Sequence, residues 1–152
     1  MMSIHRACLR LKFEDDGDGT GKLCATVEAR GFAGRGGAWF GINQVEKFAE
    51  AIGVYPLPAD KRHVLSGGYW KSHRLDQEHF AIEISQIDRR GHIGVQVRIA
   101  SELTESSRPQ SQSMLRVEMY TTYERLRQFS DDLRALVHDA GGKEILLEEG
   151  SD

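Results

Sequence analysis

The segment WFGINQVEKFAEAI, residues 39–52, decides how we interpret the fold, because its spacing of apolar residues occurs a second time. The apolar positions of the first copy are Trp39, Ile42, Val45, Phe48 and Ile52, and the same intervals separate Tyr120, Tyr123, Leu126, Phe129 and Leu133. Apolar residues spaced three and four apart lie on one face of a helix. The sequence therefore predicts two amphipathic helices with similar apolar stripes.

Segments in which apolar and polar residues alternate precede each predicted helix. They lie near 7–13 and 23–29 before the first helix, and near 80–84, 93–99 and 115–119 before the second. Alternation with one apolar face is typical of half-buried antiparallel strands. We therefore predict an α+β fold, a two-layer sandwich in which one antiparallel sheet of about six or seven strands carries both helices on one face.

The same order suggests two β-β-β-α pseudo-repeats, at 7–53 and 78–140, joined by an irregular connector at 54–77. The glycine-dense segment 31–41 is expected to be a loop followed by a short strand, and 145–147 a closing strand at a sheet edge. Asn43 is the expected N-cap of the first helix, with Glu46 at N3, and Thr122 that of the second. Gly53 is expected to end the first helix in a left-handed conformation, and Gly141 with Gly142 to end the second.

Composition limits the class of protein. The 152 residues are 39% hydrophobic and 28% charged, which predicts one globular domain over 1–152. The net charge of −3 is carried by an acidic tail at 143–152, so no overall field attracts nucleic acid or an anionic membrane. No apolar run has membrane-spanning length and no secretory signal is evident, which favours the cytoplasm. Cys8 and Cys24 are expected to be free thiols rather than a disulfide.

No motif predicts catalysis, a cofactor or a metal ion. The acidic turn at 15–19 lacks the glutamate that an EF-hand requires at its twelfth position, so a solvated hairpin tip is favoured. The glycines of 31–41 lack the spacing of a phosphate-binding loop. The six histidines show no metal-binding spacing.

The connector is the candidate partner-binding segment because basic and aromatic residues alternate in it. Such a surface can grip phosphates or an acidic protein surface. In the competing interpretation, which the usual burial of tryptophan favours, Trp70 fills the open side of the core. The candidate binding residues are Lys61, Arg62, Tyr69, Trp70, Lys71 and Arg74.

The chain resembles a bacterial domain family of uncharacterised function. The resemblance rests on core patterns: Leu9-x-Leu11-x-Phe13, the 39–52 helix, Trp70, Gly91-His92-Ile93-Gly94-Val95 and Leu126-x-x-Phe129-x-x-x-Leu133. In size and pattern the chain is also similar to toxin-neutralising immunity proteins. The resemblance implies no catalytic residue, because the family offers none.

Three functions follow as hypotheses. The first is a non-enzymatic protein-interaction module, immunity-like or regulatory, with a protein partner of unknown identity. The second is a small-molecule-binding or enzymatic domain with a pocket between sheet and helices, near Trp39, Trp70 and the glycine loop. The third and weakest is nucleic-acid binding through 61–74. An exposed sheet edge also offers a route to a homodimer.

Overall fold

The computed structural model describes residues 6–139 and 142–150, and within them the chain forms an α+β sandwich of two four-stranded antiparallel sheets. Sheet A contains, in spatial order, β3 (Phe32–Gly41), β2 (Thr20–Ala29), β1 (Cys8–Asp15) and β8 (Glu144–Glu148). Sheet B contains β4 (His63–Lys71), β5 (Arg74–Gln86), β6 (His92–Ala100) and β7 (Met114–Thr122). The helices are α1 (Ile42–Ile52), α2 (Tyr123–Leu136) and the short 3-10 helix η1 (Pro109–Ser111).

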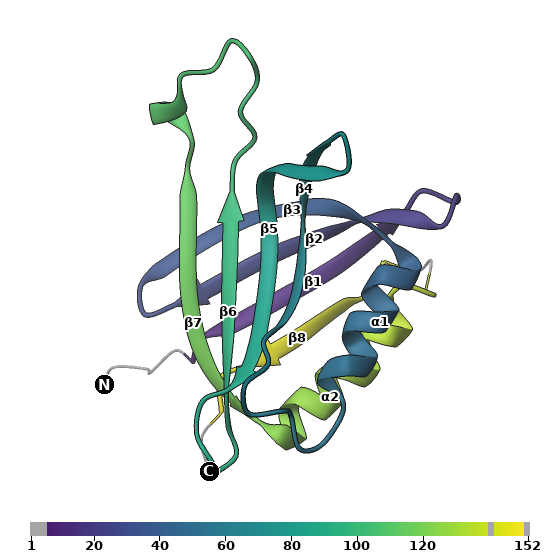
Figure 1. Cartoon of the computed structure of the whole chain (residues 1–152), viewed down its shortest axis with the longest axis vertical. Coiled ribbons are helices and arrows are strands. Elements are labelled where there is room, and N and C mark those ends of the chain that lie inside the picture. The colour runs from purple at the N-terminus through teal and green to yellow at the C-terminus, as the bar shows by residue number, and fades with distance from the viewer. Residues whose placement is uncertain (1–5, 140–141, 151–152) are drawn as a thin grey trace.

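The two sheets face each other, and their strands cross (Figure 1). The helices lie side by side along one flank of this sandwich, where α1 contacts β3 and β4 and α2 contacts β7 and β8. Each helix therefore touches an edge strand of both sheets. The apolar faces of all these elements form one contiguous core. None of the helices in the described ranges is long and apolar enough to cross a bilayer.

The α+β sandwich is confirmed, but the prediction of one sheet with six or seven strands and two helices on one face is wrong. The predicted units at 7–53 and 78–140 do not share a sheet, because the strands of the first lie in sheet A and those of the second in sheet B. The fourth strand of each sheet comes from a segment outside the two predicted pseudo-repeats. The connector 54–77 contains β4, and the acidic tail 143–152 contains β8, in which Leu147 is buried opposite Leu9 of β1.

The glycine-dense segment 31–41 is a full strand rather than a loop. Residues of β3 that face sheet B increase in size along the strand, from Gly34 and Gly36 through Ala38 to Phe40. A Cβ added at Gly34 would lie 2.6 Å from Leu115, and one at Gly36 would lie 2.5 Å from Ile99. At its other end β3 has room for Phe40, whose ring meets Phe80 edge to face at 6.2 Å. The glycines therefore allow β3 to cross close over sheet B.

The helix ends follow the sequence only in part. The Thr122 hydroxyl accepts a hydrogen bond from Arg125 N, which confirms it as the N-cap of α2. Asn43 is not a cap, because α1 begins at Ile42 after Gly41. Gly53 ends α1 with a right-handed φ of −83°, and its lack of a Cβ serves close packing instead, since a Cβ would lie 2.7 Å from Ser130 Oγ of α2. The predicted end of the second helix at Gly141 and Gly142 is wrong, because α2 ends at Leu136 with Val137 as its C-cap. Gly141 itself lies outside the described residues.

Candidate functional site: an aromatic cleft between β3 and the β4–β5 hairpin

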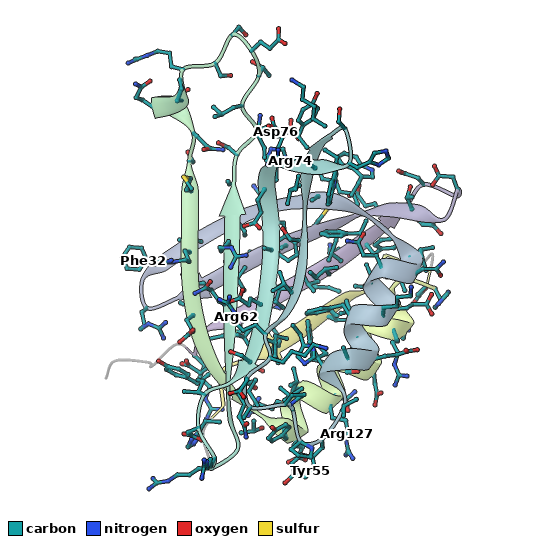
Figure 2. All side chains as sticks on the ribbon, viewed as in Figure 1. Phe32, Tyr55, Arg62, Arg74, Asp76 and Arg127 are labelled. Atoms are coloured by element: carbon teal, nitrogen blue, oxygen red, sulfur yellow. The ribbon has the colours of Figure 1, made fainter. Side chains whose placement is uncertain are left out.

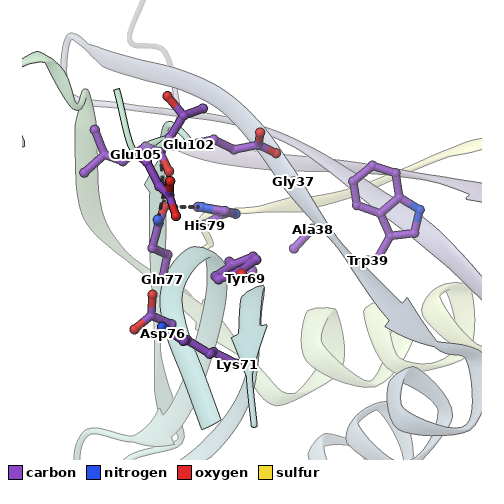
Figure 3. A pocket seen from close by; sticks show the side chains of 13 residues that line it. Gly37, Ala38, Trp39, Tyr69, Lys71, Asp76, Gln77, His79, Glu102 and Glu105 are labelled. Atoms are coloured by element: carbon purple, nitrogen blue, oxygen red, sulfur yellow. Dashed lines mark hydrogen bonds between the residues drawn. The ribbon is translucent and has the colours of Figure 1, made fainter. Parts of the chain in front are cut away.

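A cavity of about 640 Å³ lies between β3, the end of the β4–β5 hairpin and the loop that follows β6 (Figure 3). We call it the aromatic cleft. It lies beside the ends of strands and not between a sheet and the helices. Its lining residues come from three strands and the loop: Gly37, Ala38, Trp39, Gly68, Tyr69, Lys71, Asp76, Gln77, His79, Glu102, Leu103, Thr104 and Glu105.

Two irregularities in the β4–β5 pairing shape one wall of the cleft. The register shifts between Gly67 and Gly68 and again between Tyr69 and Trp70. At the first shift the strands approach so closely that a Cβ on Gly68 would lie 2.0 Å from the carbonyl oxygen of Gln77. Bulges of this kind bend a strand and change the direction of its side chains.

Tyr69 and Trp70 lie on the surface on either side of the second register shift, with exposed fractions of 52% and 51%. The interpretation in which Trp70 fills the open side of the core is therefore wrong. The core is closed instead by the second sheet, so that no gap remains for Trp70 to fill.

Trp39 is also exposed, at 52%, but two neighbours fix its ring. Its indole N–H donates a hydrogen bond of 2.9 Å to Asp16 Oδ2 at the tip of the β1–β2 hairpin. The ammonium of Lys22, directly opposite on β2, lies 5.0 Å from the centre of the ring. This arrangement holds a large amphipathic surface in place at the margin of the cleft.

The side chain of Gln77 anchors the opposite wall. Its amide nitrogen donates to Leu103 O at 2.9 Å, and its amide oxygen accepts from Leu103 N at 3.1 Å. The same oxygen lies 3.0 Å from His79 Nε2, which must carry the proton in this contact because an amide oxygen only accepts. Loop 101–113 is thereby tied to β5 beside the cleft.

The structure divides the six candidate binding residues between the two ends of β4. Lys61 and Arg62 precede its first residue, and Arg62 forms an ion pair of 3.6 Å with Glu83. The other four are on the hairpin end at the cleft, where Tyr69 and Lys71 line the cavity, Trp70 lies between them in the chain and Arg74 pairs with Lys71 across the hairpin. Figure 2 shows Arg62 well separated from Arg74 and Asp76. The segment is therefore not one continuous basic surface.

Sequence reasoning missed the polar residues that complete the cleft, namely Asp76, Gln77, His79, Glu102 and Glu105. One signal was present in the sequence. Alternation fails in β5 at 79–82, where four consecutive residues are buried. The interrupted alternation indicates an irregularity in β5. It does not indicate how β5 pairs with β4.

Two carboxylates of the acidic β1–β2 turn accept hydrogen bonds from the same hairpin. In the acidic β1–β2 turn, Asp15 accepts a hydrogen bond from Gly17 N, and Asp18 accepts bonds from Thr20 that lower the pKa of its carboxyl. Among residues 6–139 and 142–150, no three His, Cys, Asp or Glu side chains are placed to hold a metal ion.

Cys8 and Cys24 are free, as predicted. In the β1–β2 register Cys8 lies opposite Glu28, while Cys24 lies opposite Lys12. Four residues along β1 separate these positions, which corresponds to about 13 Å. A disulfide requires Cα atoms within about 7 Å. Burial, with a further contribution from Glu14, raises the pKa of the Cys24 thiol.

A second cavity, of about 650 Å³, adjoins β5, β6 and β7 on the other side of the 101–103 segment. Two of its charged lining residues are paired with each other, since Arg98 Nε donates to Glu78 Oε1 at 2.8 Å, and a second Arg98 nitrogen lies 3.7 Å from Glu83. Asp76, which also lines the aromatic cleft, and Arg116 complete its charged lining. The bond from Arg98 lowers the pKa of Glu78. The two carboxylates and two guanidinium groups of this lining cancel in charge, whereas three carboxylates and one ammonium line the aromatic cleft.

Comparison of the chain with protein-family models, with curated proteins and with solved structures finds no match. The site is therefore interpreted from its own geometry.

Proposed function

We propose that this protein is a non-enzymatic interaction module, of an immunity-like or regulatory type, that binds a protein partner through the aromatic cleft. One observation carries the proposal. Trp39, Tyr69 and Trp70 come from two different sheets, each is about half exposed, and all three lie at or beside one cleft. Tyrosine and tryptophan are the residues most enriched among those that dominate binding energy at protein interfaces.

The way Trp39 is held supports the same function. Its hydrogen bond to Asp16 and its contact with Lys22 restrict the ring before any partner arrives. Binding then requires less loss of side-chain freedom, because that freedom is already restricted in the free protein.

A small-molecule-binding domain is the second candidate, and the cavity volume favours it. About 640 Å³ falls within the range of known ligand pockets. The position of Trp70 favours a protein instead. This ring is half exposed but does not line the cavity, so a small ligand inside the cleft would leave it uncovered, whereas a protein surface would cover it.

Nucleic-acid binding through 61–74 has less support. Lys61 and Arg62 lie at the end of β4 opposite the hairpin, and three carboxylates line the cleft beside Lys71. A polyanion would be repelled by these carboxylates.

Affinity capture with three baits tests the proposal: the wild-type protein, Trp70→Ala and the control Phe32→Ala. Phe32 is 64% exposed at the other end of β3 from Trp39, and Figure 2 shows it at the left margin of the molecule, apart from Asp76. We expect a protein from the source organism to be retained by wild type and Phe32→Ala. Its dissociation constant, measured afterwards with purified partner, should rise at least about tenfold with Trp70→Ala.

Equal capture by all three baits would contradict the proposal. A thermal-shift screen against metabolites separates the second candidate. A small ligand of the cavity should lose its stabilising effect with Trp39→Ala, which changes the lining, and keep it with Trp70→Ala, which does not.

A further inference from the structure

The aromatic cleft carries an excess of negative charge without partners. Asp76, Glu102 and Glu105 line it, and Lys71 is the one lysine or arginine among the lining residues. All four belong to the described part of the chain, and none of them forms an ion pair there within 4.0 Å. Three carboxylates against one ammonium leave two negative charges in excess.

This contrasts with the outer face of sheet B, where opposite charges meet. There Arg98 contacts both Glu78 and Glu83, and Arg62 contacts Glu83. Three carboxylates without an ion pair therefore line this one cavity, although Asp76 also borders the second cavity. Two smaller cavities are each bordered by one such carboxylate, Glu124 in one and Glu50 in the other.

Aromatic rings at the cleft add a second attraction for a cation. The ring of Trp39 already lies against the ammonium of Lys22. Tyr69, half exposed in the cavity, has no ring or cation contact among the described residues. A lysine or arginine side chain gains both from a carboxylate and from the face of an aromatic ring.

The carboxylates lie on backbone that is held in place. The two hydrogen bonds between Gln77 and Leu103 fix the loop between Glu102 and Glu105 to β5, and Asp76 is the neighbour of Gln77. Figure 3 shows Glu102 and Glu105 on the loop side of the cavity and Tyr69 and Asp76 on the hairpin side.

We infer that the aromatic cleft receives a lysine or arginine side chain from a basic segment of the partner protein. The inference rests on the proposed function and specifies the chemistry of the partner. The cationic group lies against Tyr69 and is neutralised by the carboxylates of Asp76, Glu102 and Glu105.

The test is an NMR titration of the ¹⁵N-labelled protein at low salt with the peptide acetyl-Gly-Arg-Arg-Gly-amide. The control peptide replaces both arginines by citrulline, which keeps the shape and removes the charge. We expect the arginine peptide to shift the amide signals of Tyr69, Gln77 and Leu103, and to bind about tenfold more tightly than the citrulline peptide. Added salt should weaken its binding.

Two double variants with the same change in net charge complete the experiment. Glu102→Gln with Glu105→Gln should weaken binding of the arginine peptide about tenfold. Glu28→Gln with Glu50→Gln should leave it unchanged, because both glutamates are exposed on other elements and neither lines the cleft.

Equal affinity for the two peptides, absence of binding, or shifts confined to residues outside the cleft would overturn the inference. The proposed function can be judged separately. If no arginine peptide binds but a captured partner is still lost with Trp70→Ala, the interaction module stands and only the cationic chemistry is rejected.

Discussion

His63, the first residue of β4, combines burial with an unmatched polar atom. Only 8% of the residue is exposed, and its Nε2 is buried without a hydrogen-bond partner in the described structure. Burial, together with the nearby positive charge of Lys61, lowers the pKa of this imidazole below its ordinary value. The folded protein therefore favours the neutral ring, whereas the unfolded chain protonates His63 at its usual pKa of about 6.5.

This difference predicts a loss of stability in acid. As the pH falls below about 6.5, the unfolded state takes up a proton that the folded state resists, so the free energy of unfolding decreases. Above that pH both states hold the neutral ring and the contribution of His63 disappears. Urea unfolding at pH 7.5 and pH 5.5 should show that His63→Leu loses less stability on acidification than wild type does.

His73→Asn is the matched control for that measurement. His73 is exposed in the β4–β5 turn, and asparagine tolerates its left-handed φ of 67°. This variant should respond to acid as the wild type does. An unchanged response in His63→Leu would show that the buried ring does not govern the pH dependence.

At the scale of elements, β3 requires side chains of particular sizes, because its inward residues must match the distance between the two sheets. Gly36→Ala would place a methyl group 2.5 Å from Ile99 Cγ2, so β3 or sheet B must move. We expect it to lower the free energy of unfolding by about 1–3 kcal/mol.

The control for this substitution is Gly41→Ala on the same strand. An added Cβ there meets nothing within 4 Å, and its φ of −70° is open to alanine. Urea titration of both variants measures the difference. Equal stabilities for the two would contradict the close crossing of β3 over sheet B.

The sequence predicted elements better than it predicted their partners. Alternation placed β1, β2, β6 and β7, because each has a regular apolar face, and it placed β5 from the alternating positions Phe80, Ile82 and Ile84. It missed the length of β3, since glycine contributes nothing to an apolar pattern although its small size is what the crossing needs. The sequence-based hypothesis of a pocket near Trp39, Trp70 and the glycine loop named residues at the cleft but placed the pocket between a sheet and the helices. It did not give the wall formed by the β4–β5 hairpin, because the bulges that bring Tyr69 toward Asp76 depend on pairing between strands. Local sequence specifies local structure, whereas register depends on the opposing strand.

For the whole molecule, the main feature is that the chain changes sheets after each helix. Each sheet is completed by the strand that follows the helix connected to the other sheet. After α1 the chain enters sheet B as β4, and after α2 it returns to sheet A as β8. Each helix touches an edge strand of both sheets, and the interior is one contiguous core. The edge of β7 has further protection, since Tyr120 N donates to Glu149 and Tyr120 O accepts from Gly150 N. Unpaired edges otherwise attract other chains.

This arrangement predicts one cooperative unfolding transition. Trp39 reports on sheet A and Trp70 on sheet B, so Trp70→Phe and Trp39→Phe isolate one fluorescent probe in each sheet. Both probes should give the same urea midpoint. Leu147→Ala, which truncates a side chain with 1% exposure in β8, should lower both midpoints together, at a loss of about 2–5 kcal/mol. Separate midpoints would mean that the sheets unfold independently.

The pairing of β1 with β8 also has a consequence for synthesis of the chain. Cys8 meets Glu148, so the outer side of β1 finds its partner only after residues 144–148 have left the ribosome. Until then the nascent chain exposes the open outer border of β1, and closing so long a loop is slow. A chain truncated before residue 144 would keep that border open permanently, and we expect it to aggregate or to be degraded.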